Sequence, residues 1–285
     1  MLHIHLVSDS TGETVHQAAR AAIAQFPHAE VTEHIWTLVR TQEHVDLLGG
    51  SLAKHGGLLL LSVVDPKIRK AIERVCVAHA VPHLSILDPL VNLIGMVLGT
   101  TANQRPGAQH RLDDAYFKRM KAVEFAVAHD DGLNIDNLAG ADILLVGVSR
   151  TSKTPTSMYL ANRGYFVGNY ALVPNVPFPI AALDGQDCFV VGLTSDVKRL
   201  SQIRRNRLRH MADDKNDSYA QDDHIQEELK NARRLFAKHK WPVIDVSRRS
   251  VEETAASIIH LHRTWIAKKE QDDSQIDDKL ADDNL

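Results

Sequence analysis

The residues with the clearest chemical potential lie in the segment 141–157, ADILLVGVSRTSKTPTS. Its apolar run leads into Gly147, and Lys153 and Thr154 follow after five intervening residues. A strand that passes through a glycine-bearing turn into a helix is the order of a phosphate-binding P-loop. Backbone N–H groups of such a turn, and of the helix N-terminus, converge on phosphate oxygens. We therefore expect a phosphate cradle at residues 147–154.

The P-loop pattern predicts a role for several residues of this cradle. Lys153 would reach the outer phosphates as a point charge, and the Thr154 hydroxyl would bind a Mg²⁺ ion. Ser152 stands where a second glycine is usual, so it must tolerate backbone angles that glycine normally takes. An ordinary strand–turn–helix with polar turn residues is the alternative. The predicted nucleotide-binding residues are Gly147, Val148, Ser149, Arg150, Thr151, Ser152, Lys153 and Thr154.

Acidic residues at two places are candidates to assist this loop. Asp130 and Asp131 follow a helical pattern shortly before the P-loop strand. Either carboxylate would orient Mg²⁺ or accept a hydroxyl proton from a substrate, although a polar turn that ends the helix is the simpler interpretation of the sequence. Asp245 closes the short apolar run before it, as a Walker-B-like acid does at a strand end. The candidate catalytic residues are thus Lys153, Asp130, Asp131 and Asp245.

Two further segments could each bind an anion or have a purely structural role. Residues 8–15, SDSTGETV, lie where the first strand turns into the first helix. They predict either a phosphate cradle similar to that of flavodoxins, or a helix capped by Ser10 or Thr11. Residues 203–211, IRRNRLRHM, would place several arginines on one helix. These would either contact a transferring phosphoryl group or form a solvated face.

Composition narrows the class of protein. The 285 residues, 44% of them apolar, suit one large or two medium α/β domains. No run approaches the ~18 apolar residues of a membrane span, and the start shows no secretory pattern. The net charge of −3 argues against a nucleic-acid partner. Two isolated cysteines favour a reducing cytoplasm, and sixteen scattered histidines without an HExxH-type pair suggest surface or structural roles.

Alternating apolar runs and helical patterns predict parallel sheets covered by helices. We expect an N-terminal α/β domain at residues 1–110, a P-loop kinase-like domain with a connecting helix at 111–269, and an acidic disordered tail at 270–285. The expected strands are His3–Ser8, Val31–Val39, Gly57–Val64, His83–Leu87, Ile143–Val146, Asn169–Val173, Phe189–Leu193 and Pro242–Val246. The expected helices are Glu13–Gln25, Gln42–Lys54, Pro66–Ala80, Leu90–Leu98, Asp113–Ala128, a helix in the TSMYLANRG segment after the P-loop, Asp196–Met211, Ile225–His239 and Glu252–Lys268.

The string GVSRTSKTPTSMYLANRGYFVGNYALVP, with HDDG before it and SDSTGETV near the start, resembles one protein family. It is similar to the bifunctional serine/threonine kinases and phosphorylases that regulate pyruvate, phosphate dikinase, from His3 to about Trp265. A sister branch regulates phosphoenolpyruvate synthase and usually carries Cys-Gly before the lysine. Thr151-Ser152 in this chain favours the dikinase-regulating branch.

The resemblance implies a pair of reactions. The kinase direction moves the β-phosphoryl group of ADP to a threonine of the dikinase, and the reverse direction uses inorganic phosphate and releases pyrophosphate. It thereby implies ADP, inorganic phosphate and Mg²⁺ as ligands and the dikinase as protein partner. A homodimer is expected because such enzymes are commonly dimeric. Three alternatives stay open: the same chemistry on phosphoenolpyruvate synthase, a flavodoxin-like electron carrier, and a small-molecule P-loop kinase.

Overall fold

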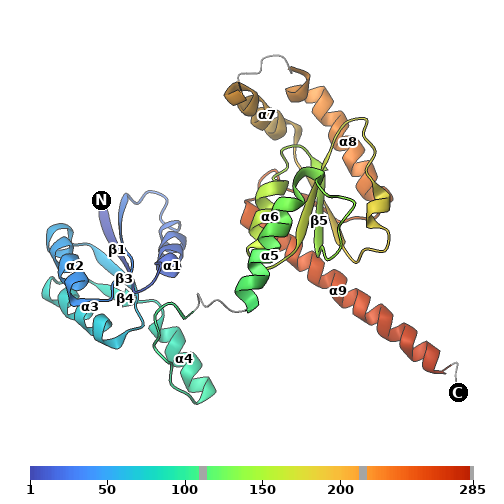
Figure 1. The fold of residues 1–285 in the computed structure, drawn as a ribbon. Coiled ribbons are helices and arrows are strands. Elements are labelled where there is room, and N and C mark those ends of the chain that lie inside the picture. The colour runs from blue at the N-terminus through green and yellow to red at the C-terminus, as the bar shows by residue number, and fades with distance from the viewer. Residues whose placement is uncertain (109–113, 212–216, 283–285) are drawn as a thin grey trace. The chain divides into compact units, whose positions relative to one another are not determined.

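The computed structural model describes residues 1–108, 114–211 and 217–282 (Figure 1). The chain divides into two compact units, Met1–Arg111 and Leu112–Leu285. Each unit contains a four-stranded sheet, and every strand pair in both sheets is parallel. The α/β class and the parallel sheets predicted from the sequence are therefore confirmed.

The first unit is a sheet of order β2-β1-β3-β4 with helices between its strands. Its buried strand β3 is a continuous leucine run, which is typical of a parallel strand covered on both faces. Its strands are β1 (Leu2–Ser8), β2 (Val31–Trp36), β3 (Leu58–Ser62) and β4 (His83–Ser85). Its helices are α1 (Glu13–Ile23), α2 (Gln42–His55), α3 (Pro66–Ala78) and α4 (Asp88–Leu98).

Alternation along β1 gives the first unit two apolar layers. Val7 packs with β3 and with the buried faces of α2 and α3, whereas Ile4 and Leu6 pack with α1 on the other face. Helix α3 begins where its sequence predicts, with Pro66 in the first turn and the Asp65 carboxylate accepting from the first backbone N–H groups.

The second unit has the strand order β6-β5-β7-β8. Its strands are β5 (Ile143–Val148), β6 (Val167–Leu172), β7 (Phe189–Thr194) and β8 (Val243–Asp245). Its helices are α5 (Asp114–Ala128), α6 (Lys153–Ala161), α7 (Val197–Met211), α8 (Asp222–Lys238) and α9 (Val251–Asp282). Short 3₁₀ turns occupy η2 (Asp130–Gly132), η3 (Ile180–Leu183) and η4 (Asp217–Ala220).

Strand β5 is buried along its whole length, and its two faces meet different helices. Leu144 and Val146 pack with the apolar face of α8, whereas Ile143 and Leu145 pack with α6 and α9. A strand enclosed in this way fixes the position of the loop that follows it.

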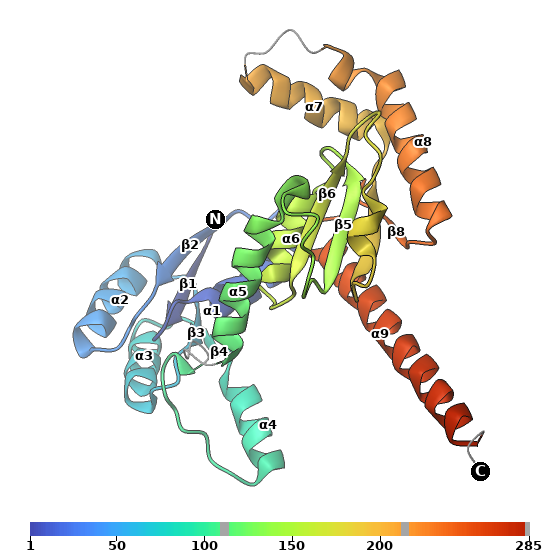
Figure 2. The ribbon, with the colours of Figure 1, turned by 45° about the vertical axis from the view of Figure 1, so that its right-hand side comes forward.

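One expectation about the C-terminal region is corrected. The sequence predicts disorder for residues 270–285, but α9 continues through Asp282 and extends well past the sheet (Figure 2); residues 283–285 lie outside the described part of the chain. Residues 270–282 contain six good helix formers beside five aspartates, which are weak ones, so low apolar content alone does not end the helix. In the described part of the chain, no helix is both long enough and apolar enough to span a membrane.

Candidate functional site

The loop between β5 and α6 needs glycine at its first position. A Cβ atom added to Gly147 would lie 2.6 Å from the backbone oxygen of Leu193 and 2.8 Å from Thr151 Oγ1. Thr151 is itself buried and donates its hydroxyl hydrogen bond to the Val148 carbonyl at 2.9 Å. The loop therefore closes tightly against the end of β7, and any larger residue at position 147 would displace it.

Two residues of this loop have left-handed backbone. Arg150 has φ of 72°, and Ser152, at the N-cap of α6, has φ of 60°. Ser152 thus adopts the conformation that glycine favours, at a cost of roughly 1–2 kcal/mol. Because α6 begins at Lys153, its first N–H groups, which have no intrahelical partners, directly follow the loop.

Lys153 is held inside the loop. Its side chain is 4% exposed, and Nζ donates to the Val148 carbonyl at 3.1 Å. Burial lowers the pKa of Lys153 to about 8, while the negative charges of Asp131 and Asp130 oppose that shift. A desolvated ammonium group with a single carbonyl partner is suited to bind an anion that enters the loop.

The two acids of η2 lie beside the start of α6. Asp130 Oδ1 accepts from the Thr154 hydroxyl at 2.8 Å and from the Asn169 amide at 2.6 Å. The backbone N–H of Asp131 donates to Asn169 Oδ1 at 3.0 Å. The structure therefore brings Asp130, Asp131, Lys153 and Thr154 together, and a buried asparagine of β6 holds the two acids in place.

Asp245 lies elsewhere. It ends β8, which is separated from β5 by β7, and it accepts from the backbone N–H and hydroxyl of Ser247. Burial raises its pKa, but these hydrogen bonds and the charges of Arg233 and Arg249 together lower the pKa below its usual value. The acid that follows β7 is Asp196, which accepts from Arg199 N at 2.7 Å at the start of α7. A strand-end pattern does not reveal strand order, which is why the sequence suggested Asp245.

One arginine of residues 203–211 contacts the β5–α6 loop and holds it in place. Arg204 is fully buried, forms a two-pronged ion pair with Glu228 of α8, and donates to the Ser149 carbonyl at 3.2 Å. Its guanidinium lies 4.4 Å from the ring centre of Tyr219, whose hydroxyl is 2.8 Å from Ser149 Oγ. Arg204 therefore positions the loop, a role that neither sequence interpretation of this stretch included.

A cleft of about 680 Å³ opens beside this loop within the second unit. Strand β5 contributes Val148, the proline-containing loop contributes residues 172–178, and α8 supplies the opposite wall. The α8 residues are His224, Glu227, Glu228, Asn231, Ala232 and Leu235. Clefts of this size with mixed apolar and polar walls are typical of small-molecule sites.

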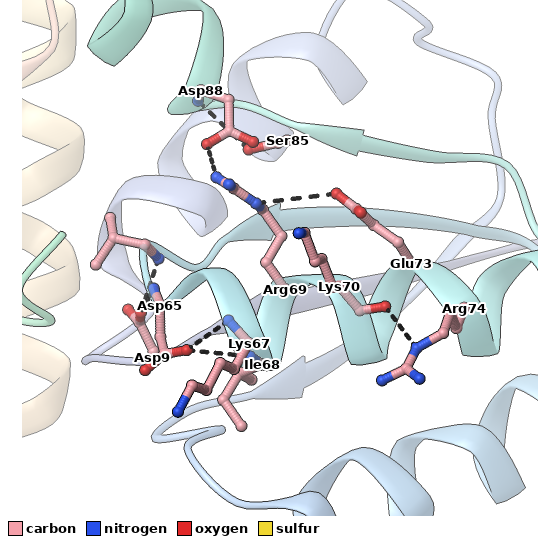
Figure 3. A network of polar contacts seen from close by, with 11 residues as sticks. Asp9, Asp65, Lys67, Ile68, Arg69, Lys70, Glu73, Arg74, Ser85 and Asp88 are labelled. Carbon is pink, nitrogen blue, oxygen red and sulfur yellow. Dashed lines mark hydrogen bonds and ion pairs between the residues drawn. The ribbon is translucent and has the colours of Figure 1, made fainter. Parts of the chain in front are cut away.

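In the first unit, the loop between β1 and α1 contains a buried carboxylate instead of a lysine. Asp9 is 2% exposed, and its Oδ2 accepts from Val64 N at 2.7 Å and from Asp65 N at 3.2 Å (Figure 3). Helix α1 has Gly12 as its N-cap, so neither Ser10 nor Thr11 takes the capping position. A buried carboxylate thus already uses two backbone donors at this end of the sheet.

The same close view shows how α3 is fixed beside that carboxylate. Arg69 lies between two acids and forms ion pairs with Asp88 at the start of α4 and with Glu73 on its own helix (Figure 3). Because the charges of Arg69, Glu73 and Asp88 pair with one another, we assign this network a structural role.

Sequence patterns missed Asn169, Arg204, Tyr219 and Glu228. Asn169 left a weak signal, because a polar residue in an otherwise apolar buried strand requires hydrogen-bond partners. The other three residues gave no signal in the sequence. Arg204 cannot be told from the neighbouring arginines, and its partners Tyr219 and Glu228 are distant in sequence and meet it only in the folded chain.

Comparisons with known proteins show the family of the chain. The kinase/pyrophosphorylase family pattern matches residues 4–259. A relative from Erythrobacter litoralis is 48% identical over 261 residues, which cover 92% of this chain and 94% of the relative. Relatives from Sphingopyxis alaskensis (48% identical, 91% and 96% covered) and Rhodospirillum rubrum (46% identical, 90% and 94% covered) match similarly. All three are named provisionally as pyruvate, phosphate dikinase regulatory proteins. The chain belongs to the kinase/pyrophosphorylase family.

Proposed function

We propose that this protein regulates pyruvate, phosphate dikinase by reversible phosphorylation of a threonine, through a P-loop kinase-like second unit. The observation that carries the proposal is the buried Lys153 in a loop that ends at a helix N-terminus, with the Thr154–Asp130 pair beside it. Family membership and the names of the relatives supply the target.

In the kinase direction, residues 147–154 bind the diphosphate of ADP, and the neighbouring cleft takes the nucleoside. The threonine oxygen of the target attacks the β-phosphorus, the bond to the AMP oxygen breaks, and AMP leaves. Lys153 stabilises the negative charge that develops on the transferring group. Asp131, which lies near Lys153 while the Asp130 carboxylate is held by Thr154 and Asn169, accepts the hydroxyl proton.

The donor set beside the loop fits Mg²⁺. The Thr154 hydroxyl and the Asp130 carboxylate are oxygen ligands 2.8 Å apart, and hard oxygen ligands are those that Mg²⁺ prefers. These two residues would hold the ion, which when bound neutralises charge on the phosphates. Asn169 keeps Asp130 in place for this task through its 2.6 Å hydrogen bond.

In the reverse direction the same loop binds inorganic phosphate next to the phosphothreonine. A phosphate oxygen attacks the phosphorus, the bond to the threonine oxygen breaks, and pyrophosphate leaves while the threonine oxygen regains its proton. Pyrophosphate and the diphosphate of ADP present similar arrays of oxygens, so one cradle with one lysine serves both directions.

The structure offers less support for a flavodoxin-like function. The segment that suggested it, residues 8–15, contains the buried Asp9, whose negative charge opposes a flavin phosphate. Two further alternatives are phosphoryl transfer to phosphoenolpyruvate synthase and phosphoryl transfer from ATP to a metabolite. The following experiment distinguishes both from the proposal.

The test uses the purified chain with purified dikinase, ADP labelled on its β-phosphorus, and a substrate that phosphorylates the dikinase histidine. We expect label on one threonine peptide and release of AMP, with no transfer to phosphoenolpyruvate synthase in a parallel reaction. Transfer from ATP in the complete absence of ADP, or to a small molecule without a protein target, would overturn the proposal.

A further inference from the structure

Three histidines that are distant in sequence meet in the first unit. His3, His34 and His55 each offer one ring nitrogen, and these three atoms lie within 4.8 Å of one another. Among the residues that the structure describes, this is the one group of three or more histidine, cysteine or acidic side chains that meets this condition. All three side chains are half-buried, so they are held by their surroundings but still reached by solvent.

The fold explains why they converge. His3 and His5 point to the same face of β1, because alternate residues of a strand share a face, and His34 of β2 pairs in register with His5. Helix α2 ends at His55, and the chain returns to the sheet through Gly56 and Gly57. A Cβ atom on Gly57, whose φ is +92°, would lie 2.0 Å from the His3 carbonyl oxygen. Glycine therefore permits the close approach that brings His55 to His3.

His5 supports the group from the interior. It is fully buried, and its Nε2 donates to the Gly56 carbonyl at 3.1 Å. Its ring stacks on that of His34 with centroids 4.6 Å apart and planes 12° apart. This contact orients the His34 ring, much as outer contacts orient the imidazole ligands of known metal sites. The remaining nitrogen of His5, Nδ1, is buried and has no hydrogen-bond partner.

The spacing suits a transition-metal ion. His3 Nδ1 and His34 Nε2 are 2.9 Å apart, where they share one hydrogen bond. Ligand nitrogens around a tetrahedral zinc ion, at about 2.05 Å from the metal, are about 3.3 Å from one another. Small rotations of the three rings would therefore create three zinc ligands, and solvent would complete the coordination.

We propose that His3, His34 and His55 form a site for a divalent transition-metal ion that prefers imidazole ligands, of which zinc is the representative. The ion would join β1, β2 and the end of α2. Asp9, at the opposite end of β1, is six residues from His3 and so about 20 Å away along the strand. The metal site is thus separate from the polar network at the carboxyl ends of these strands. It does not depend on the proposed function.

The test is a titration of the full chain, freed of metal by chelation, with Zn²⁺ followed by calorimetry. We expect one tightly bound ion per chain, and at least about 100-fold weaker binding in His34→Gln and in His55→Gln, because losing a ligand costs more than losing the outer contacts of one. His28→Gln, a change at an exposed histidine of the same unit, is the matched control and should bind as the unaltered chain does. Co²⁺ substitution should give the visible absorption of a tetrahedral site.

Misfolding of a variant is excluded by a second measurement. Circular dichroism and thermal unfolding without metal should show that His34→Gln and His55→Gln fold, and Zn²⁺ should raise Tm in the unaltered chain but not in these variants. Equal Zn²⁺ affinity in folded His34→Gln, His55→Gln and His28→Gln would overturn the site, as would the absence of stoichiometric binding to the unaltered chain. Any effect of Mg²⁺ at the same concentrations should be equal in the unaltered chain, His34→Gln and His55→Gln, because Mg²⁺ prefers oxygen ligands to imidazole.

Discussion

The two units have the same sheet topology but place opposite charges at the same topological position. In the orders β2-β1-β3-β4 and β6-β5-β7-β8, the first strand of each unit lies between the second and the third. The connections from that strand and from its third-strand neighbour leave in different directions. In open parallel sheets, ligands bind outside the carboxyl ends of strands at such a point. The loops after β1 and after β5 are therefore equivalent in topology.

The difference lies in what fills each position. After β1, the buried Asp9 carboxylate accepts from two backbone N–H groups that follow β3. After β5, the buried Lys153 ammonium donates to the Val148 carbonyl, and α6 begins at this residue. The two equivalent loops thus differ in their buried charged side chain, a carboxylate after β1 and an ammonium after β5, and in the neighbours of that group: Arg40 donates to the Asp9 carbonyl, whereas Asp130 and Asp131 lie beside Lys153.

The largest expected effect comes from removing the cation. Lys153→Ala should reduce both ADP-dependent inactivation of the dikinase and phosphate-dependent reactivation by about 10²–10³-fold, the usual loss for one electrostatic contact to a transition state. Lys67→Ala, a change at an exposed lysine in the first turn of α3, is the matched control. Rates of both reactions, measured on folded protein, provide the readout.

The same experiment tests whether one cradle serves both reactions. Thr11→Ala, in the loop of the first unit, should change neither rate by as much as Lys153→Ala does. If Lys153→Ala lost the kinase but kept the full phosphorylase rate, and Thr11→Ala did the reverse, the comparison between the units would fail and the first unit would hold a second phosphate site.

The next effect concerns stability. Asp9→Asn keeps the shape of the side chain but removes the charge from two hydrogen bonds in the first unit. Hydrogen bonds to charged groups contribute about 1.5–3 kcal/mol, so the free energy of unfolding of this unit should fall by about that amount. Denaturant titration should detect the loss, with Asp65→Asn, which retains the capping ability at α3, as the milder control. An unchanged midpoint would show that Asp9 is not a structural group.

Sequence reasoning identified the β5–α6 loop because its chemistry is local. Glycine, lysine and threonine at fixed spacing after an apolar run specify a strand, a turn and a helix together, and Ser152 does take the left-handed backbone that its position requires. The same reasoning left the 8–15 segment undecided, because the deciding partners of Asp9 lie at Val64 and Asp65, more than fifty residues away.

Long-range placement explains the other differences. Arg204 is one of several arginines in its stretch, and only the packing of α7 against α8 selects it for Glu228. Asp245 ends a strand as expected, but β7 stands between that strand and β5. The three clustered histidines come from two strands and a helix end, so no local spacing indicates them.

A smaller effect follows from the pKa of Lys153. With a pKa of about 8, below the ordinary 10.5, Lys153 loses its charge as pH rises past 8. We expect kcat/KM for ADP to fall about tenfold per pH unit above that value, and the fall in kcat to begin at higher pH, because bound phosphate favours the charged form. Stability should move the other way and rise between pH 8 and 10.5, where the unfolded chain binds the proton more tightly. A pH-independent kcat/KM up to pH 10 would contradict the assigned role of the Lys153 charge.

The smallest effect separates the nucleoside from the phosphates in the second unit. Asn231 is exposed on α8 and lines the cleft beside the loop, so Asn231→Trp should fill part of the space that we assign to adenosine. Because inorganic phosphate and pyrophosphate carry no nucleoside, this change should raise KM for ADP by about 3- to 10-fold and leave KM for phosphate in the reverse reaction unchanged. Asn231→Ala, which enlarges the cleft instead, is the control and should affect neither constant by more than about twofold. If the tryptophan raised both KM values equally, the cleft would be part of the phosphate path or of the protein-target surface. The lysine-bearing loop would then have to bind ADP with its nucleoside placed elsewhere.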